Sequence, residues 1–195
     1  MSDSSNTAFQ QHIENCLAES IGEGGLGAEE LDGLLARLDP AMDKLRATFE
    51  AGALPLLHLP AKRDDLEDLA PIAAHFQHNF TDVVILGTGG SSLGGRALYE
   101  MTRPKNGGPM PSVPSLHIVT NIDPFSFEAL FHRLNLHTTG IIVISKSGGT
   151  AETVMQFLCI LPDLIRVVGE ENLGRHATLI TQPGDNPLRR MGTRY

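Results

Sequence analysis

The sequence predicts an α/β fold, a doubly wound parallel sheet preceded by a helical N-terminal segment. From Thr81 onward, short β-branched runs alternate with helical stretches. Each run is apolar on both faces, which is typical of a parallel sheet covered by helices on two sides. Before Thr81 the apolar residues recur only at helical spacing. We therefore expect a helical segment over residues 1–80 and a sheet domain over residues 81–195.

The helical segment contains two amphipathic stretches, separated by a glycine-rich loop at residues 22–27. Pro40 is expected to break the second stretch or to lie in a first turn. Residues 53–60, rich in leucine and proline, are expected to be extended. A further helix should begin after Asp64 and Asp65. The side chains expected to face inward from it are Leu66, Leu69, Ile72 and Phe76.

Four strands are expected in the sheet domain, at residues 83–86, 116–120, 140–144 and 177–181. The helices that follow them are expected at residues 93–102, 125–134, 151–161 and from 187 onward, with Gly192 as a cap of the last one. Residues 103–114 are expected to form a surface loop. No predicted strand follows the last helix, so we expect an incomplete sheet, as in a truncated piece of a longer protein.

Composition narrows the classes of function. The 195-residue chain carries a formal net charge of −8. An acidic chain gains nothing from releasing counterions from nucleic-acid phosphates, so no nucleic-acid partner is expected. The sequence contains neither a membrane-length apolar run nor a basic and apolar leader, which predicts a cytoplasmic protein without a membrane partner. Cys16 and Cys159 are expected to be buried, reduced side chains. No metal site is expected at His75 and His78, and no cofactor is expected.

A first glycine-rich loop, Gly87-Thr88-Gly89-Gly90-Ser91-Ser92-Leu93-Gly94-Gly95, follows the first predicted strand. Such a loop before a helix suits an anion, although a tight turn without a ligand has the same composition. It is not a dinucleotide fingerprint, which needs glycine where Ser92 stands, and it is not a P-loop, because Arg96-Ala97 replaces the lysine and hydroxyl.

The same loop does match the Gly-x-Ser-x-Gly elbow of α/β-hydrolases over residues 90–94. In that alternative, Ser92 is the nucleophile. Asp163 and His176 follow it in the chain order that such enzymes use. A serine hydrolase therefore stays open as an interpretation of this loop.

A second loop, Ser145-Lys146-Ser147-Gly148-Gly149-Thr150, lies between the third predicted strand and its helix. A phosphate monoester carries nearly two negative charges and strong acceptor oxygens. Short hydroxyls and main-chain N–H groups at a helix N-terminus suit it well. One hydroxyl is enough to cap a helix, and this loop has three. The loop therefore predicts an anion site.

Residues 84–94 and 144–153, with the intervening Asn121-Ile122-Asp123-Pro124, together resemble the N-terminal part of the glucose-6-phosphate isomerase family. That family is built on sugar isomerase (SIS) domains, and the resemblance covers residues 81–195. It implies that Ser145, Lys146, Ser147 and Thr150 hold the phosphate of glucose 6-phosphate or fructose 6-phosphate. It also implies that Gly90 and Ser91 line the sugar.

The resemblance also carries expectations about activity. It implies reversible isomerisation of the two sugar phosphates in glycolysis and gluconeogenesis, and a homodimer. Gly149 stands where the family commonly has a hydroxyl, so one phosphate donor is missing. Glu152 resembles a family position near the active site, although an acid is also favoured in a helix first turn. The family's catalytic arginine, glutamate, histidine and lysine lie further along the chain, so we expect this chain alone to be inactive. A non-catalytic SIS module that senses a sugar phosphate is the alternative.

Overall fold

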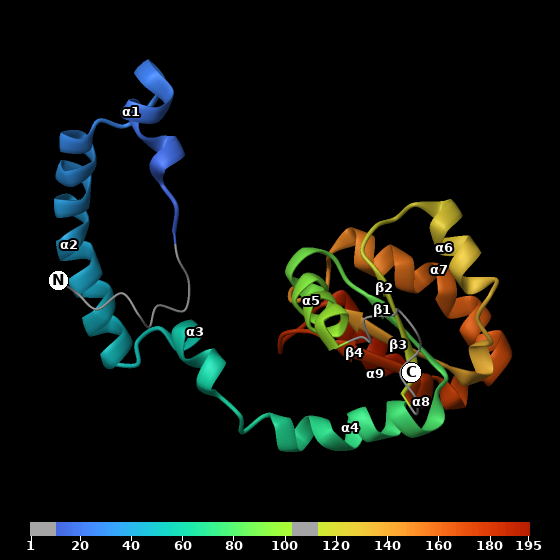
Figure 1. Ribbon diagram of the computed structural model, residues 1–195. Helices are drawn as coiled ribbons and strands as arrows, with labels where there is room; N and C mark the ends of the chain where they lie inside the picture. Colours follow the sequence, from blue (N-terminus) through green and yellow to red (C-terminus); the bar gives the residue numbers. More distant parts are fainter. Residues whose placement is uncertain (1–10, 103–112) are drawn as a thin grey trace. The chain divides into compact units, whose positions relative to one another are not determined.

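The structure, a computed structural model, describes residues 11–102 and 113–195. Packing divides the chain into two units, Met1–Asp64 and Asp65–Tyr195, whose elements are labelled in Figure 1. The helix at residues 66–79, which the sequence analysis grouped with the helical segment, belongs to the second unit. Most of the expected loop at residues 103–114 lies outside the described residues.

The first unit is helical throughout its described part. Its elements are η2 (Glu14–Cys16), α1 (Ala18–Ile21), η3 (Gly22–Gly24), α2 (Ala28–Glu50), α3 (Pro55–His58) and η4 (Leu59–Ala61). The expectation of an extended stretch at residues 53–60 is wrong from residue 55 onward, because Pro55 opens a helical turn, where its missing N–H costs nothing. Pro40 neither breaks α2 nor begins it. The surrounding helix is exposed, so water can bind the carbonyl group that Pro40 leaves free.

The second unit contains a sheet of four parallel strands, which confirms the α/β prediction. The strands are β1 (Asp82–Leu86), β2 (Ser115–Val119), β3 (Thr139–Ile144) and β4 (Ala177–Ile180), in the order β2-β1-β3-β4. The helical elements are α4 (Leu66–Asn79), η5 (Gly89–Ser91), α5 (Leu93–Thr102), α6 (Pro124–Phe131), η6 (Leu136–Thr138), α7 (Ala151–Val168), η7 (Glu170–Asn172), α8 (Leu173–His176) and α9 (Pro187–Arg194).

Helix α6 ends at Phe131, three residues before its predicted end, whereas α7 and α9 run past theirs. Helix α7 continues seven residues beyond the predicted end at residue 161, through Pro162, because six of its side chains are buried and packing outweighs one lost hydrogen bond. Gly192 lies inside α9 and does not cap it. None of the helices in the described ranges is long and apolar enough to cross a membrane.

The core lies on both faces of the two central strands. Val84 and Ile141 are fully buried on one face, against the inner sides of α6, α7 and α9. On the other face, Val83 packs with Phe76 from α4 and with Phe80, the residue directly after that helix. A side chain at Gly140 would overlap both of these rings, so glycine at this strand position lets α4 lie close to the sheet.

Three of the side chains expected to face inward from α4 do not. Phe76 is buried, whereas Leu66, Leu69 and Ile72 are 54%, 50% and 44% exposed. The helical spacing was recognised correctly, but only the C-terminal end of α4 meets the sheet. Cys16 and Cys159 are exposed free thiols, so their predicted burial is wrong.

The strand order creates a point at which the chain leaves the sheet in opposite directions. From β1 the chain passes through α5 to β2 on one side, and from β3 it passes through α7 to β4 on the other. In doubly wound sheets, ligands bind at such a switch point, at the carboxyl ends of the strands. Here the switch point lies between β1 and β3, and both glycine-rich loops follow these two strands.

Candidate functional site

The loop after β1 turns sharply against the end of β3. Gly87 is buried, and a Cβ there would lie 3.2 Å from the Cβ of Ser91 and 3.3 Å from the carbonyl oxygen of Ile144. The Ser92 hydroxyl donates to the Gly89 carbonyl at 3.2 Å and is 2% exposed. Gly90 is exposed and Ser91 is half-buried. The first loop therefore presents residues 90 and 91 to solvent, whereas Ser92 faces inward.

The loop after β3 is closed by its own hydroxyl groups. Ser145 is 2% exposed, and its Oγ lies 2.8 Å from Oγ1 of Thr150. The main-chain N–H of Thr150 also donates to Ser145 Oγ, at 3.4 Å. At the tip of the loop, Lys146 and Ser147 are exposed, and the Gly149 N–H donates to Ser147 Oγ at 3.3 Å. The hydroxyl pair fixes the base of the loop and leaves its tip accessible.

The chain after β4 supports the second loop from the other side. The Lys146 carbonyl accepts hydrogen bonds from the N–H of Gln182 at 3.0 Å and the hydroxyl of Thr181 at 3.2 Å. The Gly148 carbonyl accepts from the N–H of Leu188 at 3.1 Å. These two carbonyl groups of the loop are thus turned toward the chain after β4.

Gly148 has a special role in this support. Its φ is +66°, in the left-handed region, and a Cβ there would overlap the buried side-chain amide of Asn186. Asn186 in turn caps α9, because its Oδ1 accepts from the N–H of Arg189 at 2.9 Å. The shape of the second loop is therefore set jointly by Gly148 and by a residue 38 positions later.

The N-terminus of α7 supplies donors at the same place. The first hydrogen bond of the helix runs from the Val154 N–H to the Thr150 carbonyl, at 3.0 Å. The N–H groups of residues 151–153 therefore have no acceptor within the helix, and they lie at the positive end of its dipole. These N–H groups follow a loop that also carries the exposed Lys146, and such a helix end suits an anion such as a phosphate. Glu152 lies exposed in this first turn.

The structure thus brings Ser145, Lys146, Ser147 and Thr150 together in one loop, and it places Gly90 and Ser91 on the neighbouring strand end. Thr181 and Asn186 were not predicted from the sequence. The Asn186-Pro187 pair could have been recognised as a helix start, with Asn as cap and Pro in the first turn. The position of this pair against the second loop could not be recognised from the sequence, because it depends on the pairing of β3 with β4.

The three residues of the hydrolase alternative do not meet. Ser92 lies beyond the carboxyl end of β1, whereas His176 directly precedes β4 and so lies at the amino edge of the same parallel sheet. A nitrogen of His176, Nδ1, faces the Thr139 carbonyl at 3.2 Å. Asp163 forms an exposed ion pair with Arg166 at 2.9 Å. A strand of four residues separates the two edges by about 13 Å, too far for a relay of hydrogen bonds.

Among the described residues, no group of three or more His, Cys, Asp or Glu side chains could hold a metal ion. His75 Nε2 donates to the Arg175 carbonyl at 2.8 Å, and His78 faces the carbonyl of Ala74 at 2.6 Å. Both rings are thus engaged by main-chain groups.

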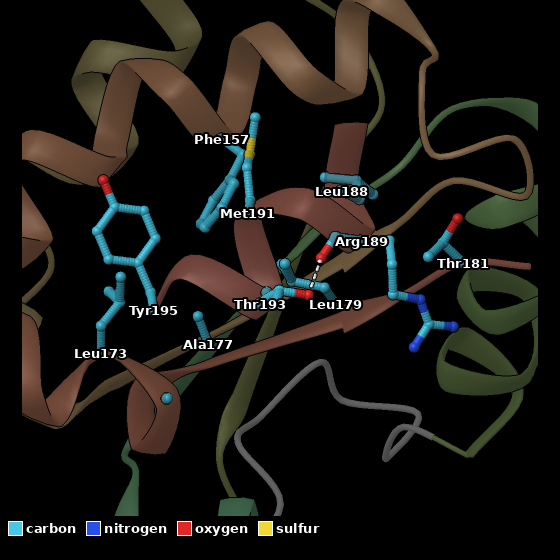
Figure 2. A pocket seen from close by; sticks show the side chains of 12 residues that line it. Phe157, Leu173, Ala177, Leu179, Thr181, Leu188, Arg189, Met191, Thr193 and Tyr195 are labelled. Atoms are coloured by element: carbon cyan, nitrogen blue, oxygen red, sulfur yellow. Dashed lines mark hydrogen bonds between the residues drawn. The ribbon is translucent and has the colours of Figure 1, made fainter. Parts of the chain in front are cut away.

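A pocket of about 360 Å³ lies beside β4, among side chains from α7, α8 and α9 (Figure 2). Phe157, Met191 and Tyr195 line it, together with Leu179 from the strand. No residue of either glycine-rich loop belongs to its lining. This pocket is therefore separate from the candidate site.

Comparison with known proteins agrees with the geometry. Residues 72–185 match the family model of phosphoglucose isomerase. The chain is 30% identical over 192 residues to a glucose-6-phosphate isomerase of Carboxydothermus hydrogenoformans, and the match covers 93% of this chain and 40% of that protein. It is 30% identical over 180 residues to the corresponding protein of Rubrobacter xylanophilus, covering 88% of this chain and 40% of that one. The chain thus spans about 40% of the length of these relatives.

Solved structures show the same fold. A hypothetical protein from Thermus thermophilus superposes with a TM-score of 0.64 and 28% identity, over 86% of this chain and 40% of its own. A glucose-6-phosphate isomerase from Chlamydia trachomatis superposes with a TM-score of 0.54 and 26% identity, over 63% of this chain and 22% of its own. Since the family model covers the sheet and both loops that form the candidate site, this chain belongs to the phosphoglucose isomerase family.

Proposed function

We propose that the loop Ser145–Thr150 binds the phosphate group of a hexose 6-phosphate. The observation that carries this proposal is the buried contact between the Ser145 and Thr150 hydroxyls. It holds the loop closed at its base, so that the exposed tip and the free N–H groups of α7 converge on one anion. Gly90 and Ser91, on the adjacent loop, line the sugar.

Either hydroxyl can be the donor in this contact, and Ser145 Oγ also accepts from the N–H of Thr150. In this proposal Ser145 donates to Thr150 Oγ1. The hydroxyl hydrogen of Thr150, a half-buried residue, is then free to be donated to a phosphate oxygen. Ser147 supplies a second hydroxyl and Lys146 the positive charge. Gly149 adds no side-chain donor.

We propose further that a protein of this family's full length converts glucose 6-phosphate and fructose 6-phosphate into each other. Isomerisation needs an acid to open the sugar ring and a base to move a proton between C1 and C2. The two loops and the first turn of α7 contain two titratable side chains, Lys146 and Glu152. In this proposal Lys146 binds phosphate, so these segments leave Glu152 without a second titratable group to share the acid and base steps. The chain alone therefore binds substrate without turnover, and the complete enzyme acts as a homodimer.

Thermal unfolding with fructose 6-phosphate, and with unphosphorylated fructose as control, tests the binding. Ligand at about 100 times its dissociation constant raises the free energy of unfolding by about 2.7 kcal/mol. The rise should occur only with the phosphorylated sugar and should fall to about 1.4 kcal/mol at the same ligand concentration in Ser147→Ala. A matched control, Ser115→Ala, changes an exposed serine at the amino edge of the sheet and should keep it. No stabilisation of a well-folded chain would contradict the proposal.

A coupled assay tests the reaction. We expect no enzyme-like turnover by the 195-residue chain and turnover by a family-length protein carrying it. Sugar-phosphate binding by the longer protein without turnover would support a sensing module instead.

A further inference from the structure

Helix α7 carries two buried polar atoms for which the described part of the chain offers no hydrogen-bond partner. They are Oγ1 of Thr153, a fully buried residue, and Oε1 of Gln156, which is 3% exposed. The two residues are three positions apart, so their side chains are neighbours on one face of the helix. Buried polar atoms in native proteins are paired with protein or with ordered water. Each oxygen therefore needs a partner, and one group that bonds to both would satisfy them together.

The orientation of the Gln156 amide is fixed by its other end. Its Nε2 donates to the carbonyl oxygen of Asn121 at 2.5 Å. Turning the amide over would place two oxygens against each other, which excludes the opposite assignment. Oε1 thus remains an acceptor without a donor, one helical turn from a hydroxyl group.

The hydrogen bond between Gln156 and Asn121 joins α7 to the loop after β2. Asn121 Oδ1 accepts from the N–H of Asp123 at 3.3 Å. Asp123 caps α6 by accepting from the N–H of Ser126 at 2.9 Å. A single buried side chain, Gln156, therefore connects the helix that begins at the phosphate loop with a third loop at the carboxyl edge of the sheet.

We propose that Thr153 and Gln156 hold an internal water molecule, and that Gln156 thereby positions the Asn121–Asp123 segment beside the sugar. The water donates to Gln156 Oε1 and shares its second bond with the Thr153 hydroxyl, in keeping with the two to four bonds of buried waters. Gln156 touches no substrate and acts as a positioning residue. The effect of Gln156 on sugar binding rests on the proposed function, whereas the water site does not depend on it.

The water site is tested without any ligand. A high-resolution crystal structure should show an ordered water within hydrogen-bond distance of both oxygens. A double-mutant cycle of Thr153→Val and Gln156→Met should be non-additive in the free energy of unfolding, because either substitution alone removes the shared water. Additive effects, or a direct Thr153–Gln156 hydrogen bond with no water, would overturn the site.

The positioning role is tested by comparing two probes. Inorganic phosphate needs only the Ser145–Thr150 loop, whereas fructose 6-phosphate also needs the surrounding loops. In Gln156→Met, calorimetry should show fructose 6-phosphate binding weakened about tenfold and phosphate binding unchanged within about twofold. The control Thr139→Val removes a fully buried hydroxyl at the amino edge, which donates to the Asn135 carbonyl, and should weaken neither.

The outcomes separate this inference from the proposed function. Suppose that the unsubstituted chain binds fructose 6-phosphate. If Gln156→Met then weakens the binding of both probes equally, or of neither, the positioning role is wrong. If the unsubstituted chain binds neither probe, the proposed function fails, and the crystal structure and the double-mutant cycle still decide the water site.

Discussion

The hydroxyl of Ser145, the residue after β3, lies 2.8 Å from the hydroxyl of Thr150, the residue directly before α7. Ser145 is 2% exposed, whereas Ser147, two positions later, is exposed. The family resemblance gave both serines the same role as phosphate ligands. The structure gives them different surroundings, and the two should therefore respond differently to substitution.

Ser145→Ala should lower the free energy of unfolding by about 1–3 kcal/mol, because it removes a buried acceptor and leaves the Thr150 N–H unpaired. Ser147→Ala should change it by less than about 0.5 kcal/mol and weaken fructose 6-phosphate binding about tenfold. Urea unfolding and calorimetric titration measure the two effects. Equal losses of stability in both variants would show that the hydroxyl pair does not hold the loop.

Gly148→Ala should destabilise the chain by about 1–3 kcal/mol, because its φ of +66° is unfavourable for alanine and the new Cβ would overlap Asn186. Gly149→Ala is the matched control. A Cβ there lies 3.7 Å from its nearest neighbour, an atom of Pro187, which is ordinary van der Waals contact. Chemical denaturation of both variants measures the difference, and a tolerated Gly148→Ala would mean that the loop has another conformation.

Asp123→Ala should lower the melting temperature at neutral pH and have little effect in acid. Hydrogen bonds from the Ser126 hydroxyl and then the Ser126 N–H lower the pKa of Asp123 below its ordinary value of 3.8. A carboxylate with a lowered pKa stabilises the fold at pH values above 3.8, and this contribution is lost as the pH falls through the lower folded value.

Melting curves recorded from neutral pH down to about pH 2 follow this loss. Asp123→Asn is the control, since asparagine caps a helix as well and carries no charge. Its stability relative to Asp123→Ala should not vary with pH. A penalty for Asp123→Ala that persists in acid would show that the charge has no part in the cap.

Ser92 should not react with a serine-directed fluorophosphonate. Its hydroxyl is buried and bonded to the Gly89 carbonyl, and His176 lies at the opposite edge of the sheet. Mass spectrometry of the treated chain, with a known serine hydrolase as positive control, detects the adduct. Stoichiometric labelling that is lost in Ser92→Ala would restore the hydrolase interpretation.

Much of the sheet domain could be predicted from the sequence. Strands β1 and β3 are β-branched runs bounded by glycine or serine, and their pattern reflects burial on both faces, which depends on local residues alone. The prediction was poorer where packing decides. Helix α7 passes through Pro162 because its buried face holds it. At residues 55–61 the error was a local one, because Pro55 and Pro60 stand in first turns, where a helix tolerates proline.

The sequence by itself determined the alternation of strands and helices, the two glycine-rich loops and the hydroxyls that suit a phosphate. These depend on residues close together in the chain. Only the tertiary structure decided which hydroxyl is buried, which residues support the loop and which helix side chains are covered. Thr181 supports Lys146 across 35 positions, and Gln156 reaches Asn121 across the same number. Such contacts exist only once all four strands have paired in register, because pairing brings distant strand ends to one edge of the sheet.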